Sequence, residues 1–237
     1  MISAQLPFRY AVYFCPSPDS DWGLAGAQWL GRCAITGKTS QQLEISGIDS
    51  ELFRSLTSDP KRYGWHATLK APFKLAPEHE VGDLLLKLHQ LAKSLKPFDL
   101  PKLEVSSVGG FLSLRPKIAS DELDAAAAMC VRDLQSFSLP LTEKELTRRR
   151  NKAELTPEQD KLLVDWGYPW VLDEFNFHFS LTGSLDSVDA KTEKKLIQAA
   201  KHHFQNLSIC RFDRIALVIE PEAGKDFEVI KLLELYP

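Results

Sequence analysis

The sequence lacks several features that define large classes of proteins. No apolar run approaches the roughly 18 residues that a transmembrane helix requires, so we expect no membrane association. The net charge is −3, from 29 Lys and Arg against 32 Asp and Glu. Proteins that coat nucleic acids usually carry a basic excess, which is absent here. No linker rich in Gly, Ser or Pro divides the 237 residues, so we expect a single domain over 1–237.

Cysteine is scarce and shows no metal-binding pattern. The four cysteines, Cys15, Cys33, Cys130 and Cys210, include no CxxC pair. This pattern predicts reduced, mostly buried thiols and neither a disulfide framework nor a metal site. The first residues, MISAQLPFRYAVYF, contain no basic segment followed by an apolar stretch of about 7–15 residues. We therefore expect no secretory signal and a cytoplasmic protein.

What the sequence does contain is an internal repeat. After residue 65, and again after residue 175, the pattern predicts a strand, a helix and a strand. The two first strands match at five positions: aromatic, His, any residue, hydroxyl, Leu. They read WHATL over 65–69 and FHFSL over 177–181, with their histidines 112 positions apart (178 minus 66). This match indicates two equivalent halves, with motif strands at 65–70 and 177–182.

On a strand, alternate residues share a face, so each histidine lies beside a hydroxyl. His66 and Thr68 then point away from the core, as do His178 and Ser180. One imidazole could take a proton from an attacking water while the other donates one to a leaving oxygen. The hydroxyls could bind the oxygens of a phosphate. A single strand histidine is more often satisfied by a local carbonyl, but the duplicated motif favours catalysis. Either histidine could be the base.

The paired HATL and HFSL motifs resemble those of the two-histidine (2H) phosphoesterase superfamily. The segments RYGWHATLKAPF, LTEKELTRRR, WGYPWV and FHFSLTG further resemble a bacterial branch associated with phosphonate catabolism, the DUF1045 proteins. The resemblance implies an α+β, bilobal fold over 1–237. In that fold, two interleaved, pseudo-symmetric lobes with antiparallel sheets form a central cleft, and helices lie outside.

The resemblance also implies a metal-independent cyclic phosphodiesterase with no cofactor. Its expected partner is a small phosphorylated substrate, a ribose cyclic phosphate that is either a nucleotide or a phosphoribosyl compound. One alternative is an enzyme of RNA ends, either a 2′,3′-cyclic phosphodiesterase or a 2′-5′ RNA ligase-like protein, although the net charge of −3 favours a small molecule. Another alternative is a nucleotide-binding module without turnover.

Further residues are weaker candidates for substrate binding. Each of them has an ordinary structural explanation beside the functional one, such as a surface lysine, a helix-end arginine or a core aromatic. Arg148 and Arg149 belong to a run that ends a capped helix, where cations are favoured in any case. The remaining candidates are Lys70, Thr182, Tyr168, Tyr63 and Tyr10.

The run Gly37-Lys38-Thr39 superficially suggests a nucleotide-binding P-loop. That motif requires another glycine five positions before Gly37, where this chain has Arg32. No convincing strand precedes the run either. We therefore do not predict a P-loop.

Overall fold

The computed structural model describes residues 6–151 and 154–236. The first five residues, on which the expectation of no secretory signal partly rests, lie outside this range. The helices are α1 (Asp21–Leu30), α2 (Ser50–Leu56), α3 (Ser58–Tyr63), α4 (Val81–Ser94), α5 (Asp121–Asp133), α6 (Glu143–Arg150), α7 (Pro157–Trp166) and α8 (Ala190–Phe204), with short 3₁₀ turns at Gln135–Phe137 and Leu172–Glu174. The strands are β1 (Arg9–Phe14), β2 (Ala67–Phe73), β3 (Phe98–Asp99), β4 (Leu103–Val108), β5 (Phe111–Pro116), β6 (Phe179–Ser180), β7 (Arg211–Phe212), β8 (Arg214–Glu220) and β9 (Glu228–Glu234).

Seven strands form one antiparallel sheet in the order β4-β5-β6-β2-β1-β8-β9, and β3 pairs with β7 separately. The prediction of an α+β fold with antiparallel strands is confirmed. The seven strands of the large sheet do not divide into one sheet for each half of the chain, however. The short strand β6 pairs with β5 on one side and with β2 on the other, so it joins the two groups into one sheet.

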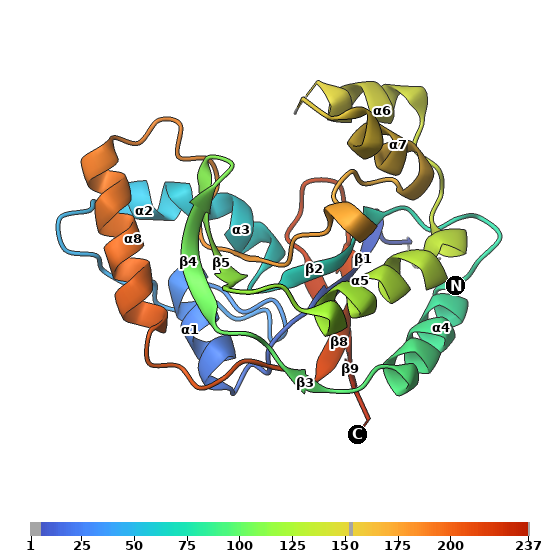
Figure 1. Ribbon diagram of the computed structural model, residues 1–237, viewed down its shortest axis with the longest axis horizontal. Helices are drawn as coiled ribbons and strands as arrows, with labels where there is room; N and C mark the ends of the chain where they lie inside the picture. The colour runs from blue at the N-terminus through green and yellow to red at the C-terminus, as the bar shows by residue number, and fades with distance from the viewer. Residues whose placement is uncertain (1–5, 152–153, 237) are drawn as a thin grey trace, which may run out of the picture.

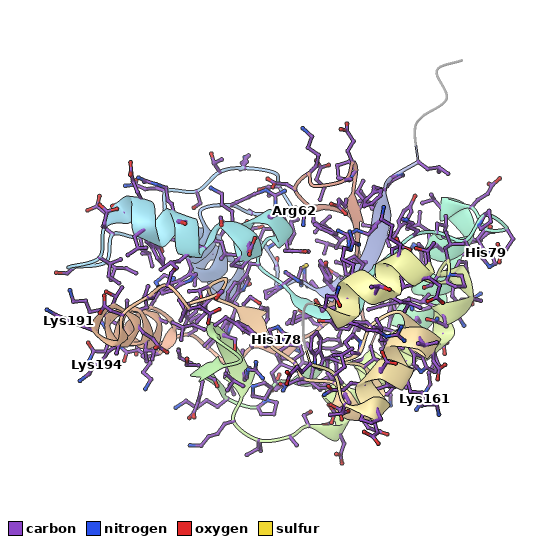
Figure 2. All side chains as sticks on the ribbon, turned by 90° about the horizontal axis from the view of Figure 1, so that it is seen from above. Arg62, His79, Lys161, His178, Lys191 and Lys194 are labelled. Atoms are coloured by element: carbon purple, nitrogen blue, oxygen red, sulfur yellow. The ribbon has the colours of Figure 1, made fainter. Side chains whose placement is uncertain are left out.

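Helices cover the sheet at both ends of the molecule. Figure 1 shows α1, α2 and α8 around β4 and β5; at the opposite end α4 lies beside β8 and β9, and α5 packs on β2. The apolar stripe of α4 buries Leu84, Leu88 and Leu91, as its helical spacing predicts. Viewed from above in Figure 2, His178 lies near the middle of the molecule, between the α8 end and the end that carries Lys161. No helix among the described residues has the length and apolar character needed to cross a membrane.

A Gly-Gly pair inside the run of strand-forming residues over 102–114 predicts a bulge or bend within one strand, but Gly109 and Gly110 form a tight turn. Both glycines have positive φ, 69° and 78°. Glycine adopts positive φ without steric cost, and positive φ at both central residues suits the two-residue turn of a β-hairpin. The predicted strand over 102–114 is therefore two strands, β4 and β5.

Two prolines also lie inside a helix or a strand, elements that proline usually interrupts. The dipeptide Asp59-Pro60 is typical of a turn, but Pro60 lies in the first turn of α3, where a missing N–H costs nothing. Pro72 does not break its strand either. Strand β6 pairs with β2 only at Ala67, so Pro72 lies where that edge of β2 is free. The helix α3 matters below because it carries Asp59.

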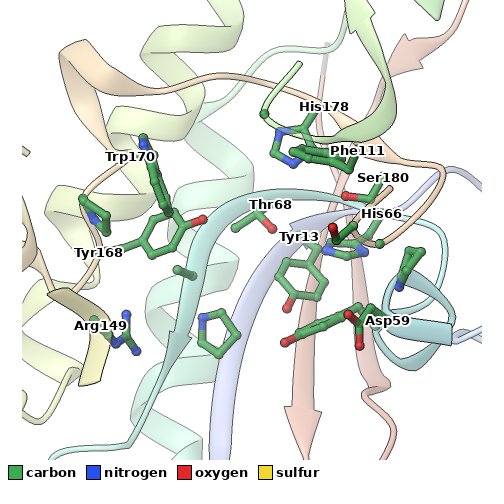
Figure 3. Close-up of a pocket in the computed structure, with 18 of the residues that line it drawn as sticks. Tyr13, Asp59, His66, Thr68, Phe111, Arg149, Tyr168, Trp170, His178 and Ser180 are labelled. Carbon is green, nitrogen blue, oxygen red and sulfur yellow. The ribbon is translucent and has the colours of Figure 1, made fainter. Parts of the chain in front are cut away.

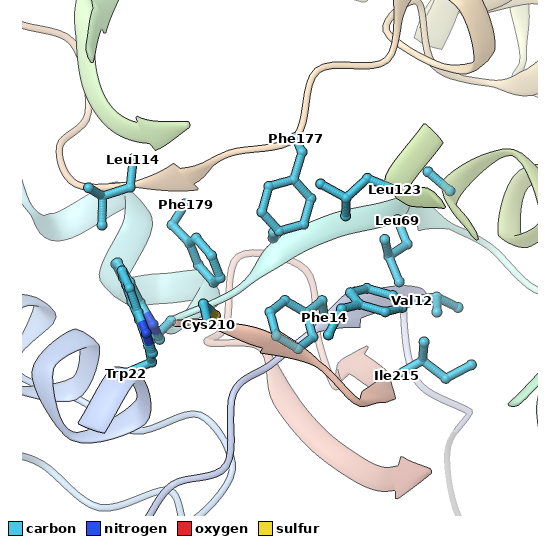
Figure 4. Packing of buried hydrophobic residues seen from close by; sticks show 14 of the residues in the cluster. Val12, Phe14, Trp22, Leu69, Leu114, Leu123, Phe177, Phe179, Cys210 and Ile215 are labelled. Carbon is cyan, nitrogen blue, oxygen red and sulfur yellow. The ribbon is translucent and has the colours of Figure 1, made fainter. Parts of the chain in front are cut away.

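The main core is rich in aromatic rings, which pack between the sheet and the helices (Figure 4). Alternation along β1 sends Tyr10, Val12 and Phe14 into this core and Tyr13 to the opposite face. Three of the cysteines are buried here or nearby and all four are free thiols, as predicted. Burial raises the pKa of Cys130 to about 12, which keeps that thiol protonated.

Candidate active site

The register of two neighbouring strands brings the repeated motifs together. Ala67 of β2 pairs with Phe179 of β6, and the strands are antiparallel. It follows that His66 lies opposite Ser180 and that Thr68 lies opposite His178. Directly opposed side chains share a face, with Cβ atoms about 4.5–5.5 Å apart. The two histidines and two hydroxyls therefore form a four-cornered group on one face of the sheet.

The opposite face of the same strands is fixed by core packing. Burial alternates along both motifs, with Trp65, Ala67 and Phe179 buried and the histidines and hydroxyls partly open. The Trp65 ring stacks between Phe179 and Phe204, with ring centroids 4.7 and 5.4 Å away. This packing explains why the sequence places large apolar residues next to each polar pair.

Both histidines make the same hydrogen bond. The Nδ1–H of His66 donates to the carbonyl oxygen of Gly64, and that of His178 donates to the carbonyl oxygen of Asn176, each at 2.8 Å. A carbonyl only accepts, so the proton lies on Nδ1 and Nε2 is free for chemistry. Gly64 has φ 79°, and a Cβ there would stand 2.3 Å from that of Ala34. Glycine is therefore required at the position that orients His66.

The environment keeps both imidazoles neutral in the ligand-free protein. Burial lowers the pKa of His66 to about 4, and the nearby charge of His178 lowers it as well. Burial also lowers the pKa of His178, with a further contribution from Arg115. Both rings therefore present a lone pair on Nε2 near pH 7. An anion bound between them would raise both pKa values and favour protonation of one ring.

Aromatic rings hold each imidazole in place. The Tyr13 ring packs on His66 with centroids 4.0 Å apart, and Tyr63 lies 5.9 Å from it. Phe111 flanks His178 at 5.7 Å. Figure 3 shows Tyr13 beside His66 and Phe111 beside His178.

The group opens into a pocket of about 590 Å³. Most of the residues that the sequence singled out line it, namely His66, Thr68, His178, Ser180, Tyr63, Arg148, Arg149, Tyr168 and Thr182. The Thr182 hydroxyl is already engaged, because it accepts a hydrogen bond from the backbone N–H of Leu112. Thr182 is therefore a wall of the pocket whose hydroxyl oxygen already accepts a hydrogen bond from the backbone.

Lys70 and Tyr10 do not line this pocket, contrary to the expectation from sequence. A register shift between β1 and β2 skips Leu69, because Val12 pairs with Lys70 and Tyr13 with Thr68. This bulge turns Lys70 away from the histidines, and its Nζ donates to Gln135 at 3.0 Å. Tyr10 faces the core, where its ring packs near Phe73.

Several lining residues were not among the sequence candidates. Arg9 and Tyr13 reach the pocket from β1, and Asp59 reaches it from α3. Tyr13 follows from the alternation of β1 once the buried face is known. Asp59 was hidden because Asp59-Pro60 resembles a turn. Phe111 and Ser184 lie in segments whose sequence gives no functional signal.

One buried carboxylate organises the rim beside β1. Glu220 is only 1% exposed and forms ion pairs with Arg9 and Arg62. It also accepts the backbone N–H of Gly224 at 2.7 Å. Arg9, which borders the pocket, is therefore paired within the protein, but Glu220 is a single carboxylate shared by two guanidinium groups. Among residues 6–151 and 154–236, no group of three His, Cys, Asp or Glu side chains is arranged to hold a metal ion.

Comparison with known proteins gives one family and two curated relatives. The model of the family described as "Protein of unknown function (DUF1045)" matches residues 68–228. A protein of Janthinobacterium sp. (strain Marseille) named ribose 1,5-bisphosphate phosphokinase PhnN is 39% identical over 203 residues, which cover 86% of this chain and 45% of that protein. A protein of the same name from Laribacter hongkongensis (strain HLHK9) is 32% identical over 230 residues, covering 96% of this chain and 52% of that protein. The chain thus spans about half the length of these relatives.

Proposed function

The chain belongs to the DUF1045 family, and from this premise and the geometry of the pocket we propose that it is a cyclic phosphodiesterase. Its substrate would be a small ribose cyclic phosphate, and its fold a variant of the 2H phosphoesterase fold. The observation that carries the proposal is the pairing of Ala67 with Phe179, which gathers two imidazoles and two hydroxyls on one face. A chain that only bound a nucleotide would not require both histidines with free Nε2 atoms.

The reaction needs one base and one acid. One imidazole Nε2 takes a proton from water, whose oxygen attacks phosphorus. The bond from phosphorus to one ribose oxygen breaks, and the other imidazole, protonated in the complex, donates its proton to that oxygen. The products are a phosphomonoester and a free hydroxyl. The ring that acted as base is now protonated, and the ring that acted as acid is now neutral. The pseudo-symmetry of the site leaves either histidine able to act first as base.

We expect the hydroxyls of Thr68 and Ser180 to donate to the non-bridging oxygens. Charge builds on these oxygens as water attacks, and a donor fixed on a strand stabilises that charge without reorganising. The hydroxyl of Thr68 lies opposite one histidine and that of Ser180 opposite the other. Each hydroxyl would thus bind the phosphate next to the ring on the facing strand.

The curated relatives carry the name of a kinase, which is a different reaction. This chain spans about half of each of them, and its Gly37-Lys38-Thr39 run lies in an irregular segment with no helix before Ser50. A P-loop would place a helix N-terminus directly after such a run. We therefore do not extend the kinase name to this chain. Opening a ribose 1,2-cyclic phosphate at its 2-oxygen gives a ribose 1-phosphate, and only a starting compound that also carried a 5-phosphate would give ribose 1,5-bisphosphate, the compound in the relatives' name.

Purified protein tested against a panel of ribose cyclic phosphates is expected to hydrolyse at least one of them. The panel should contain 2′,3′-cyclic nucleotides, short RNAs with 2′,3′-cyclic ends and ribose 1,2-cyclic phosphates. Because two imidazoles supply both proton transfers, activity should survive an excess of chelator. Product can be followed by ³¹P NMR. No turnover of any member, or strict dependence on an added metal, would refute the proposal.

The pH profile of the reaction should be displaced toward acid in kcat/KM. That parameter reports the free enzyme, in which one imidazole must be protonated and the other neutral. Since burial lowers the pKa of both rings, and that of His66 to about 4, the protonated acid becomes scarce as pH rises toward neutrality. The maximum of kcat/KM should therefore lie below pH 6.5.

Bound substrate reverses the direction of this shift. Its negative charge raises both pKa values, so the profile of kcat should peak at a higher pH than that of kcat/KM. Initial rates at saturating and limiting substrate from pH 4 to pH 9 separate the two parameters. Coincident profiles centred above pH 7 would contradict the assignment of the two rings.

A further inference from the structure

One end of the pocket carries positive charge that no carboxylate of the described chain balances. Arg148 and Arg149, at the end of α6, line the pocket together with Tyr168, which follows α7. Figure 3 shows Arg149 and Tyr168 on one side of the pocket and the two histidines on the other. Cations are favoured at a helix C-terminus in general. That preference explains arginines in this turn but does not explain why two of them border the pocket.

The neighbouring charges are already paired with other groups. Arg150 forms an ion pair with Asp160, and Glu145 binds Lys74. Within residues 6–151 and 154–236, Arg148 and Arg149 form no ion pair. Arg149 donates one hydrogen bond, to the carbonyl oxygen of Gly167. A guanidinium has five N–H groups, so most of its donors remain open to a ligand.

Tyr168 connects this end of the pocket to the catalytic group. Burial raises the pKa of Tyr168 to about 12, so its hydroxyl stays protonated and able to donate. Figure 3 shows the hydroxyl end of Tyr168 directed toward Thr68. Ala71 and Pro72 of β2 line the wall as that strand continues beyond Thr68. The only carboxylate lining the pocket, among described residues, is Asp59, which Figure 3 places on the side away from Arg149.

We propose that Arg148, Arg149 and Tyr168 form a second anion site, which binds a terminal phosphomonoester of the substrate. This rests on the proposed function and narrows it. The substrate would be a sugar with a cyclic phosphodiester held by the histidines and a phosphomonoester held by the arginines. Two guanidinium forks suit the three oxygens and double negative charge of a monoester. A nucleoside 2′,3′-cyclic phosphate without a further phosphate would leave this end of the pocket unpaired.

The test compares ribose 1,2-cyclic phosphate with the same compound carrying a 5-phosphate. We expect the protein to prefer the 5-phosphorylated compound in kcat/KM. Arg149→Met and Arg148→Met should each reduce that preference by about 10–100-fold, the range expected for a lost charge-assisted hydrogen bond. Most of the effect should appear in KM for the phosphorylated compound, because the reacting phosphate is elsewhere.

Arg150→Met is the matched control. It removes an arginine from the same turn, but Arg150 pairs with Asp160 and does not line the pocket. Its preference should equal that of the unchanged protein. Arg148 is exposed and its side chain forms no hydrogen bond or ion pair with the described residues, so its variant remains informative if Arg149→Met loses structure through its bond to Gly167. Equal rates on the two compounds, or a preference unchanged in both Arg148→Met and Arg149→Met, would overturn this inference and leave the phosphodiesterase proposal standing. If the protein hydrolysed neither of these compounds nor any other cyclic phosphate, the proposed function itself would be refuted.

Discussion

Replacing either His66 or His178 with alanine is expected to lower kcat for cyclic phosphate hydrolysis by about 10²–10⁴-fold, the usual contribution of a positioned acid or base. Each ring presents a free Nε2 to the same group of side chains, since its Nδ1 proton is held by a backbone carbonyl. Alanine removes the proton acceptor or donor from the reacting centre. The loss should appear in kcat more than in KM, because the hydroxyls of Thr68 and Ser180 still hold the phosphate.

The double variant separates a shared role from two independent ones. Because the acid and the base act on one displacement, removing both should cost far less than the product of the two single losses. His202→Ala is a suitable control, since His202 is exposed on α8 and contacts only Gln205 through its ring. Near-normal turnover in either His66→Ala or His178→Ala, in a folded protein, would end the two-histidine assignment.

A large loss of stability is expected from Gly26→Ala. A Cβ at this position in α1 would stand 2.0 Å from Cγ of Trp65, far inside van der Waals contact. Trp65 cannot retreat, because its ring is stacked between Phe179 and Phe204. Helix α1 cannot move away either, because that movement would expose Trp29 and Leu30, which are buried in the core. We expect a loss of about 3 kcal/mol in the free energy of unfolding, the upper end of the usual cost of overpacking.

Thermal unfolding measures this loss, with an expected fall in Tm of about 6–12 °C for a chain of this size. Gly82→Ala is the matched control in another helix. A Cβ at Gly82 meets nothing within 4 Å, so alanine there should be neutral or stabilise α4 slightly. Catalytic activity should fall together with stability in Gly26→Ala, because Trp65 directly precedes His66. Equal melting temperatures for the two variants would show that α1 does not hold Trp65 as tightly as the packing indicates.

The motif strands show what the sequence could predict about the site. Alternation at 65–69 and 177–181 correctly gave the face of each histidine, because period two is a local property of a strand. The capping boxes at Thr142 and Thr156 likewise begin helices, as the structure shows for α6 and α7. The antiparallel pairing of the two motifs is not local, and their repeat only suggested that they meet.

The errors arose where tertiary contacts override a local pattern. Lys70 would face the histidines on a regular strand, but the bulge at Leu69 turns it toward α5. Tyr10 is buried in the core although it carries a hydroxyl, because β1 lies in the interior of the sheet. The lowered pKa values of the histidines also depend on burial by distant segments. An unperturbed imidazole has a pKa of about 6.5, which would let one ring be charged near neutral pH, whereas burial lowers the pKa of both rings and favours their neutral forms in the free protein.

The pairing between Ala67 and Phe179 also determines when the site appears as the chain folds. It joins positions 112 residues apart through a strand of only two residues. Closing so long a loop costs conformational entropy, and this cost precedes the favourable energy of these few contacts. Hairpins such as β4 with β5 and β8 with β9 can form earlier from local contacts. The site is thus assembled late in folding, and a sub-global opening that frees β6 would abolish it while the rest of the sheet stays paired.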